Sequence, residues 1–211
     1  MLDAPRRPAP VRPGSPGSTL RTHRLKGALG NLVTYLGILL LLGPWLAIPF
    51  LPQPRYAGDW RVVMLVVGTA LMLGGVSLYA WSLKALLPAF REQFSEFTPG
   101  ALVVSGPYRY TRHPIYLSSL VILAGLDLAL GAAFSTLLLP VSYLLFKLIT
   151  LYEERVILEP KFPQEYAQYR RRVRAGLLGR TGGALASVVY LGLAAITLLE
   201  TTGVYDFGFV R

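Results

Sequence analysis

Two short segments of the chain hold most of the side chains that could do chemistry. Residues 106–116 contain one of the two histidines, His113, surrounded by arginines and tyrosines. Residues 152–155 contain the adjacent carboxylates Glu153 and Glu154. An imidazole and two carboxylates can hydrogen-bond a polar ligand, and an arginine can hold a carboxylate through two parallel bonds. These residue types together are typical of a site that binds a charged small molecule.

The apolar runs between the two segments predict that they meet. One run begins after Pro114 and ends near residue 130, and Gly131 permits a tight turn into a second run, 134–151. If the two runs form an antiparallel hairpin about residue 132, His113 and Glu153 lie at the same end and at neighbouring depth. Pro114 is suited to the first turn of a helix, so the free N–H groups of that turn could also face a ligand.

The composition indicates that these helices belong to a membrane protein. Hydrophobic residues make up 53% of the 211-residue chain and charged residues only 15%, with a mean hydropathy of +0.48. A soluble domain has about a quarter charged residues. The formal net charge is nevertheless +10, and an apolar body with basic loops is typical of membrane proteins. Nucleic-acid binding needs a polar domain that displays the basic patch, and few polar stretches are long enough, so we expect no nucleic-acid partner.

The counts of cysteine and histidine exclude several kinds of site. The chain has no cysteine, which rules out a disulfide-stapled scaffold, a thiol nucleophile, cysteine-ligated zinc and an iron–sulfur cluster. Two histidines leave little for a histidine-rich metal centre. We therefore expect no metal.

Five apolar runs are candidates for membrane-spanning helices, because about 20 apolar residues at 1.5 Å each cross a hydrocarbon core of ~30 Å. The fold class we predict is an all-α integral membrane protein with about five transmembrane helices. The third run is short for a span, so it and the fourth could form a hairpin of uneven depth. The runs are 31–51, 62–83, 114–130, 134–151 and 183–199.

The basic residues predict how the chain crosses the membrane. Seventeen of the 21 lysines and arginines fall in three segments, 1–26, 82–114 and 152–182. These segments share one side if five helices cross in turn, which predicts a cytoplasmic N-terminus and a C-terminus on the opposite side. The basic run 170–174 is expected to attract anionic lipid headgroups.

The chain divides into four expected regions. Residues 1–26 are a basic, proline-rich arm that we expect to be disordered. Residues 27–100 hold the first two transmembrane helices and an interfacial amphipathic helix, 83–97, in which Pro88 could cause a kink. Residues 101–182 form the catalytic and ligand-binding region around the hairpin, and residues 183–211 form the fifth helix with a short tail. Within 101–182, Pro163 predicts the start of a second amphipathic helix, with a stripe of Phe162, Tyr166, Tyr169 and Val173.

Two ionisable residues interrupt apolar runs. Lys147 precedes Glu154 by seven residues and therefore shares its helix face. At that depth an ionisable side chain normally faces protein or water, so Lys147 either extends to the cytoplasmic surface or takes part in the site. Asp127 lies near the outer end of its run, where we interpret it as an interface residue. The arginines and tyrosines near His113 could likewise be ordinary interfacial anchors.

Two ordered motifs carry a resemblance to a known superfamily. The segment ALVVSGPYRYTRHPIYL, residues 101–117, resembles the signature of the integral-membrane methyltransferases, which include isoprenylcysteine carboxyl methyltransferases and phospholipid N-methyltransferases. The second motif resembles the superfamily pattern Glu-Glu … Phe-Gly-x-x-Tyr-x-x-Tyr-x-x-Arg-Val, and here it consists of Glu153-Glu154-Arg155, Phe162, Glu165-Tyr166, Tyr169 and Arg172-Val173. The resemblance covers roughly residues 102–174, a third of the chain.

Three positions depart from the pattern. Ser118 stands where glycine often follows the tyrosine of the first motif, which could alter how closely a cofactor approaches the helix. Pro163 stands where glycine usually follows the phenylalanine. The proline common after Arg-Val-x-Arg is absent, and Ala175-Gly176-Leu177 stands there instead. The last departure, with the extra fifth helix, puts the substrate side of the architecture in doubt.

The resemblance implies a membrane-embedded enzyme that transfers a methyl group from S-adenosylmethionine, bound by cytoplasmic segments, to a lipophilic or small acceptor. An isoprenylcysteine-type carboxylate, a lipid amine and a thiol remain open as acceptors. The catalytic candidates are Arg109, Glu154 and Arg172. The cofactor-binding candidates are Tyr108, Arg112, His113, Pro114, Tyr116, Leu117, Glu153, Glu154, Tyr166 and Tyr169.

Two other functions remain open from the sequence. Some membrane sterol and isoprenoid reductases share related C-terminal motifs, and such an enzyme would bind NADPH instead; the sequence has no clear additional phosphate-binding element. A non-enzymatic membrane protein could use the same basic face to hold anionic lipid. In that case the two motifs would be interfacial anchors, and neither cofactor would bind.

Overall fold

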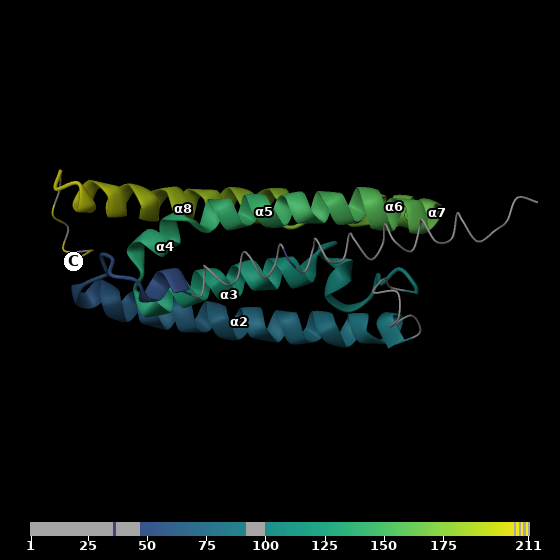
Figure 1. Cartoon of the computed structure of the whole chain (residues 1–211), viewed down its shortest axis with the longest axis horizontal. Coiled ribbons are helices and arrows are strands. Elements are labelled where there is room, and N and C mark those ends of the chain that lie inside the picture. The colour runs from purple at the N-terminus through teal and green to yellow at the C-terminus, as the bar shows by residue number, and fades with distance from the viewer. Residues whose placement is uncertain are drawn as a thin grey trace, which may run out of the picture.

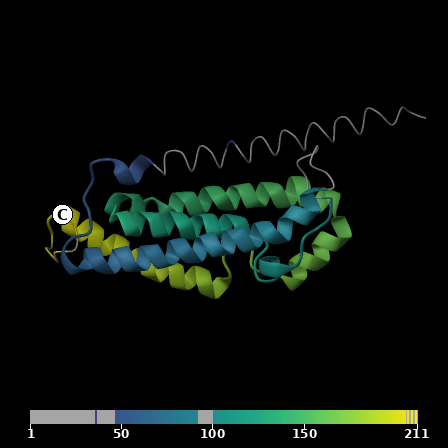
Figure 2. The ribbon, with the colours of Figure 1, turned by 90° about the horizontal axis from the view of Figure 1, so that it is seen from below.

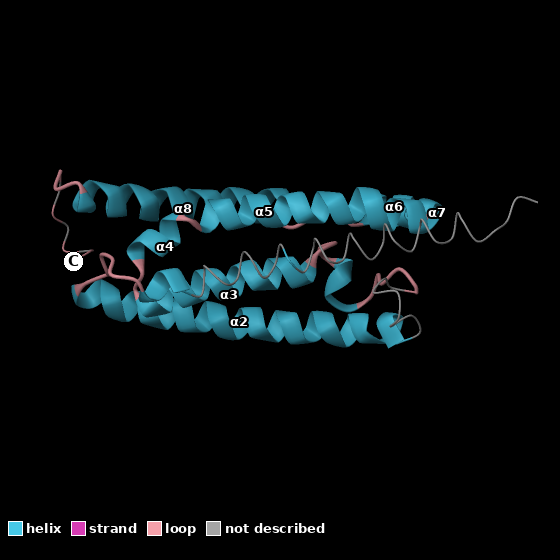
Figure 3. Ribbon diagram, viewed as in Figure 1, coloured by secondary structure: helices cyan, strands magenta, loops and turns pink. Residues whose placement is uncertain are grey.

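The computed structural model describes Leu36, residues 47–91 and 100–204, Asp206, Gly208 and Val210. All the secondary-structure elements named within these residues are helices (Figures 1 and 3). This confirms the all-α fold class. The expected arm, 1–26, and most of the first apolar run lie outside the described residues. The elements are the 3₁₀ turns η1 (Ile48–Phe50) and η2 (Gly106–Arg109), the π-helical stretch η3 (Glu153–Leu158), and α2 (Gly58–Arg91), α3 (Pro114–Leu130), α4 (Ala133–Leu137), α5 (Leu139–Tyr152), α6 (Glu159–Lys161), α7 (Pro163–Arg172) and α8 (Arg180–Thr201).

The helices lie in two layers along one long axis. α2 and α3 run antiparallel in one layer, and α5 and α8 form the other (Figure 1). The view in Figure 2, turned by 90°, shows α2, α3 and α5 side by side, with α7 at the end where α2 finishes. A cluster of Tyr116, Leu120, Leu123, Phe146 and Leu177 fills the space between the layers. Burial of these side chains holds the helix ends that carry the two motifs at a fixed distance.

Close backbone contact joins α2 to α3. A Cβ on Gly68 would lie 2.3 Å from the backbone nitrogen of Ala129, and a Cβ on Gly125 would lie 2.7 Å from the carbonyl oxygen of Gly68. Gly75 meets Ile122 in the same way, at 2.7 Å from its Cγ1. Small residues allow two helices to approach this closely in a membrane, where van der Waals packing drives association.

The predicted hairpin is present, with its turn at Gly131. Gly131 has a φ of 70°, the left-handed conformation that glycine adopts without steric cost. The N–H groups of Gly131 and Ala132 close the end of α3 by bonding to Leu128 and Asp127 carbonyls, at 3.0 and 2.9 Å. The fourth apolar run is divided into α4 and α5 at Leu138, because the Pro140 ring cannot continue a helix that includes Thr136.

Two described helices are long and apolar enough to cross a membrane. They span Gly58–Ala89 of α2 and Gly183–Thr201 of α8, and most of each apolar surface faces outward. α3 is apolar but has only 17 residues, as the sequence indicated. The total of about five spans stays a prediction.

The end of α2 differs from the expected separate interfacial helix. Residues 83–91 continue α2 without interruption through Pro88, and residues 92–99 lie outside the described part of the chain. The amphipathic helix predicted from Pro163 is confirmed as α7. Its expected stripe is present, because Tyr166, Tyr169 and Val173 are buried together with Phe162 packed beside them.

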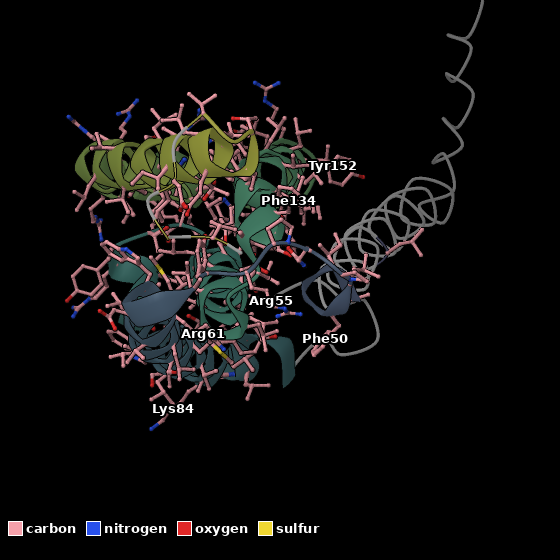
Figure 4. The ribbon with its side chains drawn as sticks, turned by 90° about the vertical axis from the view of Figure 1, so that its left-hand side faces the viewer. Phe50, Arg55, Arg61, Lys84, Phe134 and Tyr152 are labelled. Atoms are coloured by element: carbon pink, nitrogen blue, oxygen red, sulfur yellow. The ribbon has the colours of Figure 1, made fainter. Side chains whose placement is uncertain are left out.

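The opposite end of the bundle is held by polar contacts (Figure 4). Arg55 donates to the carbonyl of Leu130 at 2.8 Å, and the Tyr56 N–H donates to Gly131 at 3.1 Å. Asp127 is fully buried at this end. Our interpretation of Asp127 as an interface residue is therefore wrong, because packing within the protein excludes water from its side chain.

Candidate active site

His113 stands at the centre of the site, immediately before α3. Its Nε2 lies 2.7 Å from Oε1 of Glu154, and its Nδ1 lies 3.5 Å from Oε2 of Glu153. Both carboxylates belong to η3, which follows α5 directly, and π-helical turns inside helices occur frequently at functional sites. The hairpin therefore brings the two sequence motifs into contact, as their spacing predicted.

Arg112 connects the same carboxylate to the segment after α7. Its Nε donates to Oε1 of Glu154 at 2.9 Å. Its Nη1 donates to the carbonyls of Val173 and Arg174, at 2.7 and 3.1 Å, and its backbone N–H donates to Ala175 at 3.0 Å. The structure thus uses most of the guanidinium for internal contacts. Arg112 was a candidate for binding the cofactor carboxylate, but only Nη2 lacks an acceptor among the described residues.

Burial and the neighbouring charges shift the pKa values of His113 and Glu154 in opposite directions. His113 and Glu154 are each 4% exposed. Burial alone would lower the pKa of His113, but the two carboxylates outweigh it and raise that pKa above its usual value of 6.5. Burial would raise the pKa of Glu154, but His113 and Arg112 lower it to about 2. At neutral pH Glu154 is therefore an ionised acceptor, and His113 donates a hydrogen bond to it through Nε2.

Buried acceptors remain available beside His113. Oε2 of Glu153 is buried, and its partner among the described residues is Nδ1 of His113 in a long ion pair of 3.5 Å. The Tyr166 hydroxyl is buried next to Glu154 and Arg112, and both charged groups act on it. Burial raises the pKa of Tyr166, so its hydroxyl stays protonated. A buried polar atom without a partner is costly unless a ligand satisfies it.

The other candidate tyrosines pack around the site and fix the elements that carry it. The Tyr169 hydroxyl donates to the carbonyl of Tyr108 at 2.8 Å, which fixes α7 against η2. Burial raises the pKa of both tyrosines. Tyr116 is buried between His113 and Phe146, with ring centroids 5.9 and 5.7 Å away. Tyr116 thus sets the position of the imidazole ring.

The remaining candidates divide into two groups. Pro114 is buried at the first turn of α3, and Leu117 is half-buried one turn later. Arg109 and Arg172 are exposed, at the ends of η2 and α7, with no side-chain contact to the cluster. The described structure does not bring these two arginines together with His113.

The positions that depart from the superfamily pattern either support the helices or lie beside the cluster of His113, Glu154 and Arg112. Ser118 is fully buried and its hydroxyl donates to Ile115 at 2.7 Å. Pro163 begins α7. Gly176 lies next to Arg112, with Thr111 donating to its carbonyl. Sequence reasoning missed Thr111 and Gly176 as site neighbours, although the substitution at 175–177 was a signal that this segment is special.

An apolar cavity of about 620 Å³ lies beside the site. Its walls come from α3, α5 and α8, with one residue each of α2, α4 and the segment before α8. Leu117, four residues after His113, and Leu178, two residues after Gly176, are part of its lining. The cavity therefore begins close to the polar cluster in sequence and extends along the apolar parts of the helices.

The titration of His113 predicts how stability depends on pH. A raised folded-state pKa stabilises the protein fully below 6.5, and that stabilisation is lost as the pH rises through the folded-state value. Glu154, with its pKa lowered from 4.5, stabilises fully above 4.5 and loses the effect as the pH falls toward about 2. The contribution of the pair is thus greatest between 4.5 and 6.5.

This dependence can be measured on the purified protein in detergent. We expect the difference in thermal midpoint between wild type and His113→Gln to narrow as the pH is raised from about 6 to about 9. A difference that stays constant over this range would show that His113 is not charged in the folded protein.

Residues 63–165 match the model of the phospholipid methyltransferase family. The match contains the whole first motif, both glutamates and the hairpin between them, and it ends one residue before Tyr166. No curated protein and no solved structure matches the chain.

Proposed function

Since this chain belongs to the superfamily of integral-membrane methyltransferases, we propose that it transfers a methyl group from S-adenosylmethionine to a lipid acceptor at the membrane surface. The observation that carries the proposal is the buried cluster of His113, Glu154 and Arg112. All three residues lie within the family match, residues 63–165. A simple structural ion pair needs one carboxylate, whereas here Glu153 adds a second one, whose buried Oε2 lies 3.5 Å from Nδ1 of His113.

The donor atoms of the cluster fit the polar groups of S-adenosylmethionine. Oε2 of Glu153 would accept a hydrogen bond from the α-ammonium group or a ribose hydroxyl. The Tyr166 hydroxyl and Nη2 of Arg112 could donate to ligand oxygens, and the free N–H groups at the start of α3 face the same region. Aromatic faces such as that of Tyr116 attract a cation, as a sulfonium is. Four kinds of group on the cofactor thus find complementary chemistry.

When bound, the cofactor supplies a methyl group on a positively charged sulfur. The acceptor's lone pair would take this methyl group, and the cofactor would leave as a neutral thioether that keeps the electron pair of the broken carbon–sulfur bond. Holding the nucleophile and the methyl group in line supplies much of the rate. The chain contributes by fixing the imidazole and Glu154 before binding, since Arg112 bonds to Glu154 and the Tyr116 ring packs against His113.

The apolar cavity supports a lipophilic acceptor. Its volume of about 620 Å³ is within the range of pockets that bind drug-sized molecules, and it is bounded by aliphatic side chains. The exposed apolar faces of α2 and α8 support a position within a bilayer. An acceptor would then reach the cluster laterally, with its chains in the cavity, while the cofactor enters from the aqueous side.

The site lies at the end of the bundle that carries most of the basic residues. By the positive-inside rule this end is cytoplasmic. The N-terminus would then be cytoplasmic and the C-terminus on the other side. The basic residues at the end of α7 would face anionic headgroups at the same surface.

Calorimetric titration of the purified full chain with S-adenosylhomocysteine tests the proposal. We expect saturable heat and a rise in thermal midpoint with ligand concentration, because binding to the folded state stabilises it. A titration with NADPH is the matched comparison and should give neither effect. The absence of heat and of any thermal shift at saturating S-adenosylhomocysteine would overturn the proposal, as would binding of NADPH alone.

A further inference from the structure

The described side chains of α8 pack against the bundle along the second half of the helix. Tyr190 and Leu193 are half-buried there, and Thr197 is fully buried. The Tyr190 hydroxyl donates to the carbonyl of Leu137 in α4 at 2.8 Å. Residues 184–189, by contrast, are all exposed, and Figure 2 shows the start of α8 farther from α3 and α5 than its end. The helix is therefore anchored at the end of the bundle opposite to the site.

The first half of α8 nevertheless forms one wall of the apolar cavity. Residues at helical spacing on one face of α8 line it, and α3 and α5 line the other walls. The row on α8 consists of Gly183, Ala186, Ser187, Tyr190 and Leu193. α8 follows the family match, which ends at residue 165. This wall is thus an addition of the chain beyond the matched region.

The cavity has one end near the site and one end at α4. Leu117 and Leu128 both line it from α3, and at 1.5 Å per residue they lie about 16 Å apart along the helix. Leu117 follows His113 by one helical turn. At the other end, Leu193 packs in the same cluster as Leu128, and Thr136 of α4 is buried beside the cavity. These three side chains bound the cavity at α4.

The chemistry of the cavity walls determines what can occupy the cavity. None of the described residues that line it is charged. The hydroxyls of Ser187, Tyr190 and Thr136 each donate to a backbone carbonyl, at 2.8, 2.8 and 3.0 Å. These hydroxyls therefore need no acceptor on an occupant. A hydrocarbon chain, which has neither charge nor hydrogen-bonding groups, fits such walls at no cost in unpaired polar atoms.

We propose that α8 selects the acceptor by the length of its hydrocarbon chain, with Leu193 as the residue that limits that length. The inference rests on the proposed function, because it takes the cavity to hold the acceptor's chain. An extended chain advances about 1.2 Å per backbone bond, so a hydrocarbon of about 13 carbons fills the length of the cavity. Further carbons would have to displace Leu193 or leave the cavity, and close packing at the α4 end resists the first.

Thermal unfolding of the purified full chain with added straight-chain primary alcohols tests the inference. The probes are uncharged single chains of about 8 to about 18 carbons, which bracket the expected length, in micelles of one detergent. We expect the half-saturating mole fraction to be lowest near the expected length and about fivefold higher for the longest chains, as overpacking predicts. Ala186→Phe should abolish the stabilisation at every length, because the ring would fill the cavity between its ends. Leu193→Ala should move the optimum to chains about two carbons longer, since it removes two bonds of side-chain length.

Val188→Phe is the matched control, because it places the same ring on α8 at a position that is 70% exposed and outside the cavity lining. Its chain-length profile should be that of wild type.

A wild-type response that does not vary with chain length would overturn the inference. So would an unchanged response in Ala186→Phe, an equal loss in Val188→Phe, or an optimum that stays in place in Leu193→Ala. S-adenosylhomocysteine affinity, measured in parallel, should stay within about twofold of wild type in Ala186→Phe, because distant sites act independently. Failure of wild type to bind S-adenosylhomocysteine would instead contradict the proposed function, while the alcohol series still decides whether the cavity beside α8 selects by chain length.

Discussion

Glu154→Gln is expected to lower S-adenosylhomocysteine affinity and methyl transfer by about 100-fold or more. Oε1 of Glu154 accepts from both His113 and Arg112, at 2.7 and 2.9 Å, while its side chain is almost fully buried. A glutamine has the same shape but lacks the charge, and its amide nitrogen cannot accept either donor. Removing one partner of a buried charge pair typically costs about 3–5 kcal/mol.

Removal of the Glu154 charge would also affect His113 and Arg112, which it contacts. Without the carboxylate, the pKa of His113 falls, because one of the two charges that raise it is gone. Arg112 would keep its bonds to Val173 and Arg174 but lose the link to η3. The variant should therefore show a lower thermal midpoint together with weaker ligand binding.

Glu159→Gln is the control for this variant. Glu159 pairs with Arg170 at 2.7 Å, but both side chains are largely exposed. Exposed ion pairs contribute about 0–1 kcal/mol, so this change should leave affinity and thermal midpoint close to wild type. Calorimetric titration and thermal unfolding in one detergent compare the two variants directly. Affinity in Glu154→Gln equal to that of wild type would remove Glu154 from the site.

The hairpin and its polar end were predictable because the signals are local. Gly131 between two apolar runs predicts a turn, and the turn brings residue 113 and residues 153–154 to one end whatever the details of packing. The contact of His113 with the glutamates follows from that geometry. Pro163 and the aromatic stripe after it likewise predicted α7, since both depend only on sequence spacing.

The groups that the buried site residues contact depend on tertiary packing, which the spacing of residues in the sequence does not determine. Arg112 was expected to face a ligand, but carbonyl groups at 173–174 surround its Nη1, and their position is set by how α7 packs. The sequence left open whether Lys147 extends to the cytoplasmic surface or takes part in the site, and the structure places its Nζ near Gly176. Asp127 is buried by packing at the turn end of the bundle. Such residues are placed by tertiary structure, not by periodicity.

The close approach of α2 and α3 makes Gly125 a position where a small change should cost stability. An added Cβ would lie 2.7 Å from the Gly68 carbonyl oxygen and 2.7 Å from the Met72 backbone nitrogen. Both obstacles are backbone atoms, so the helices must separate rather than a side chain rotate. Overpacking of this kind costs about 1–3 kcal/mol and occasionally more. We expect Gly125→Ala to lower the thermal midpoint and Gly125→Leu to prevent recovery of folded protein.

Gly74→Ala separates this packing effect from the intrinsic helix preference of alanine. Gly74 also lies within α2, but no heavy atom other than its own helix backbone is within 4 Å of its Cβ position. Alanine favours a helix over glycine by about 1 kcal/mol, so Gly74→Ala should be neutral or stabilising while Gly125→Ala destabilises. Equal thermal midpoints for the two variants would show that α2 and α3 do not touch at Gly125. Because α3 carries His113 at its start, separation of this helix pair should also weaken S-adenosylhomocysteine binding, even though Gly125 lies more than three turns from the site.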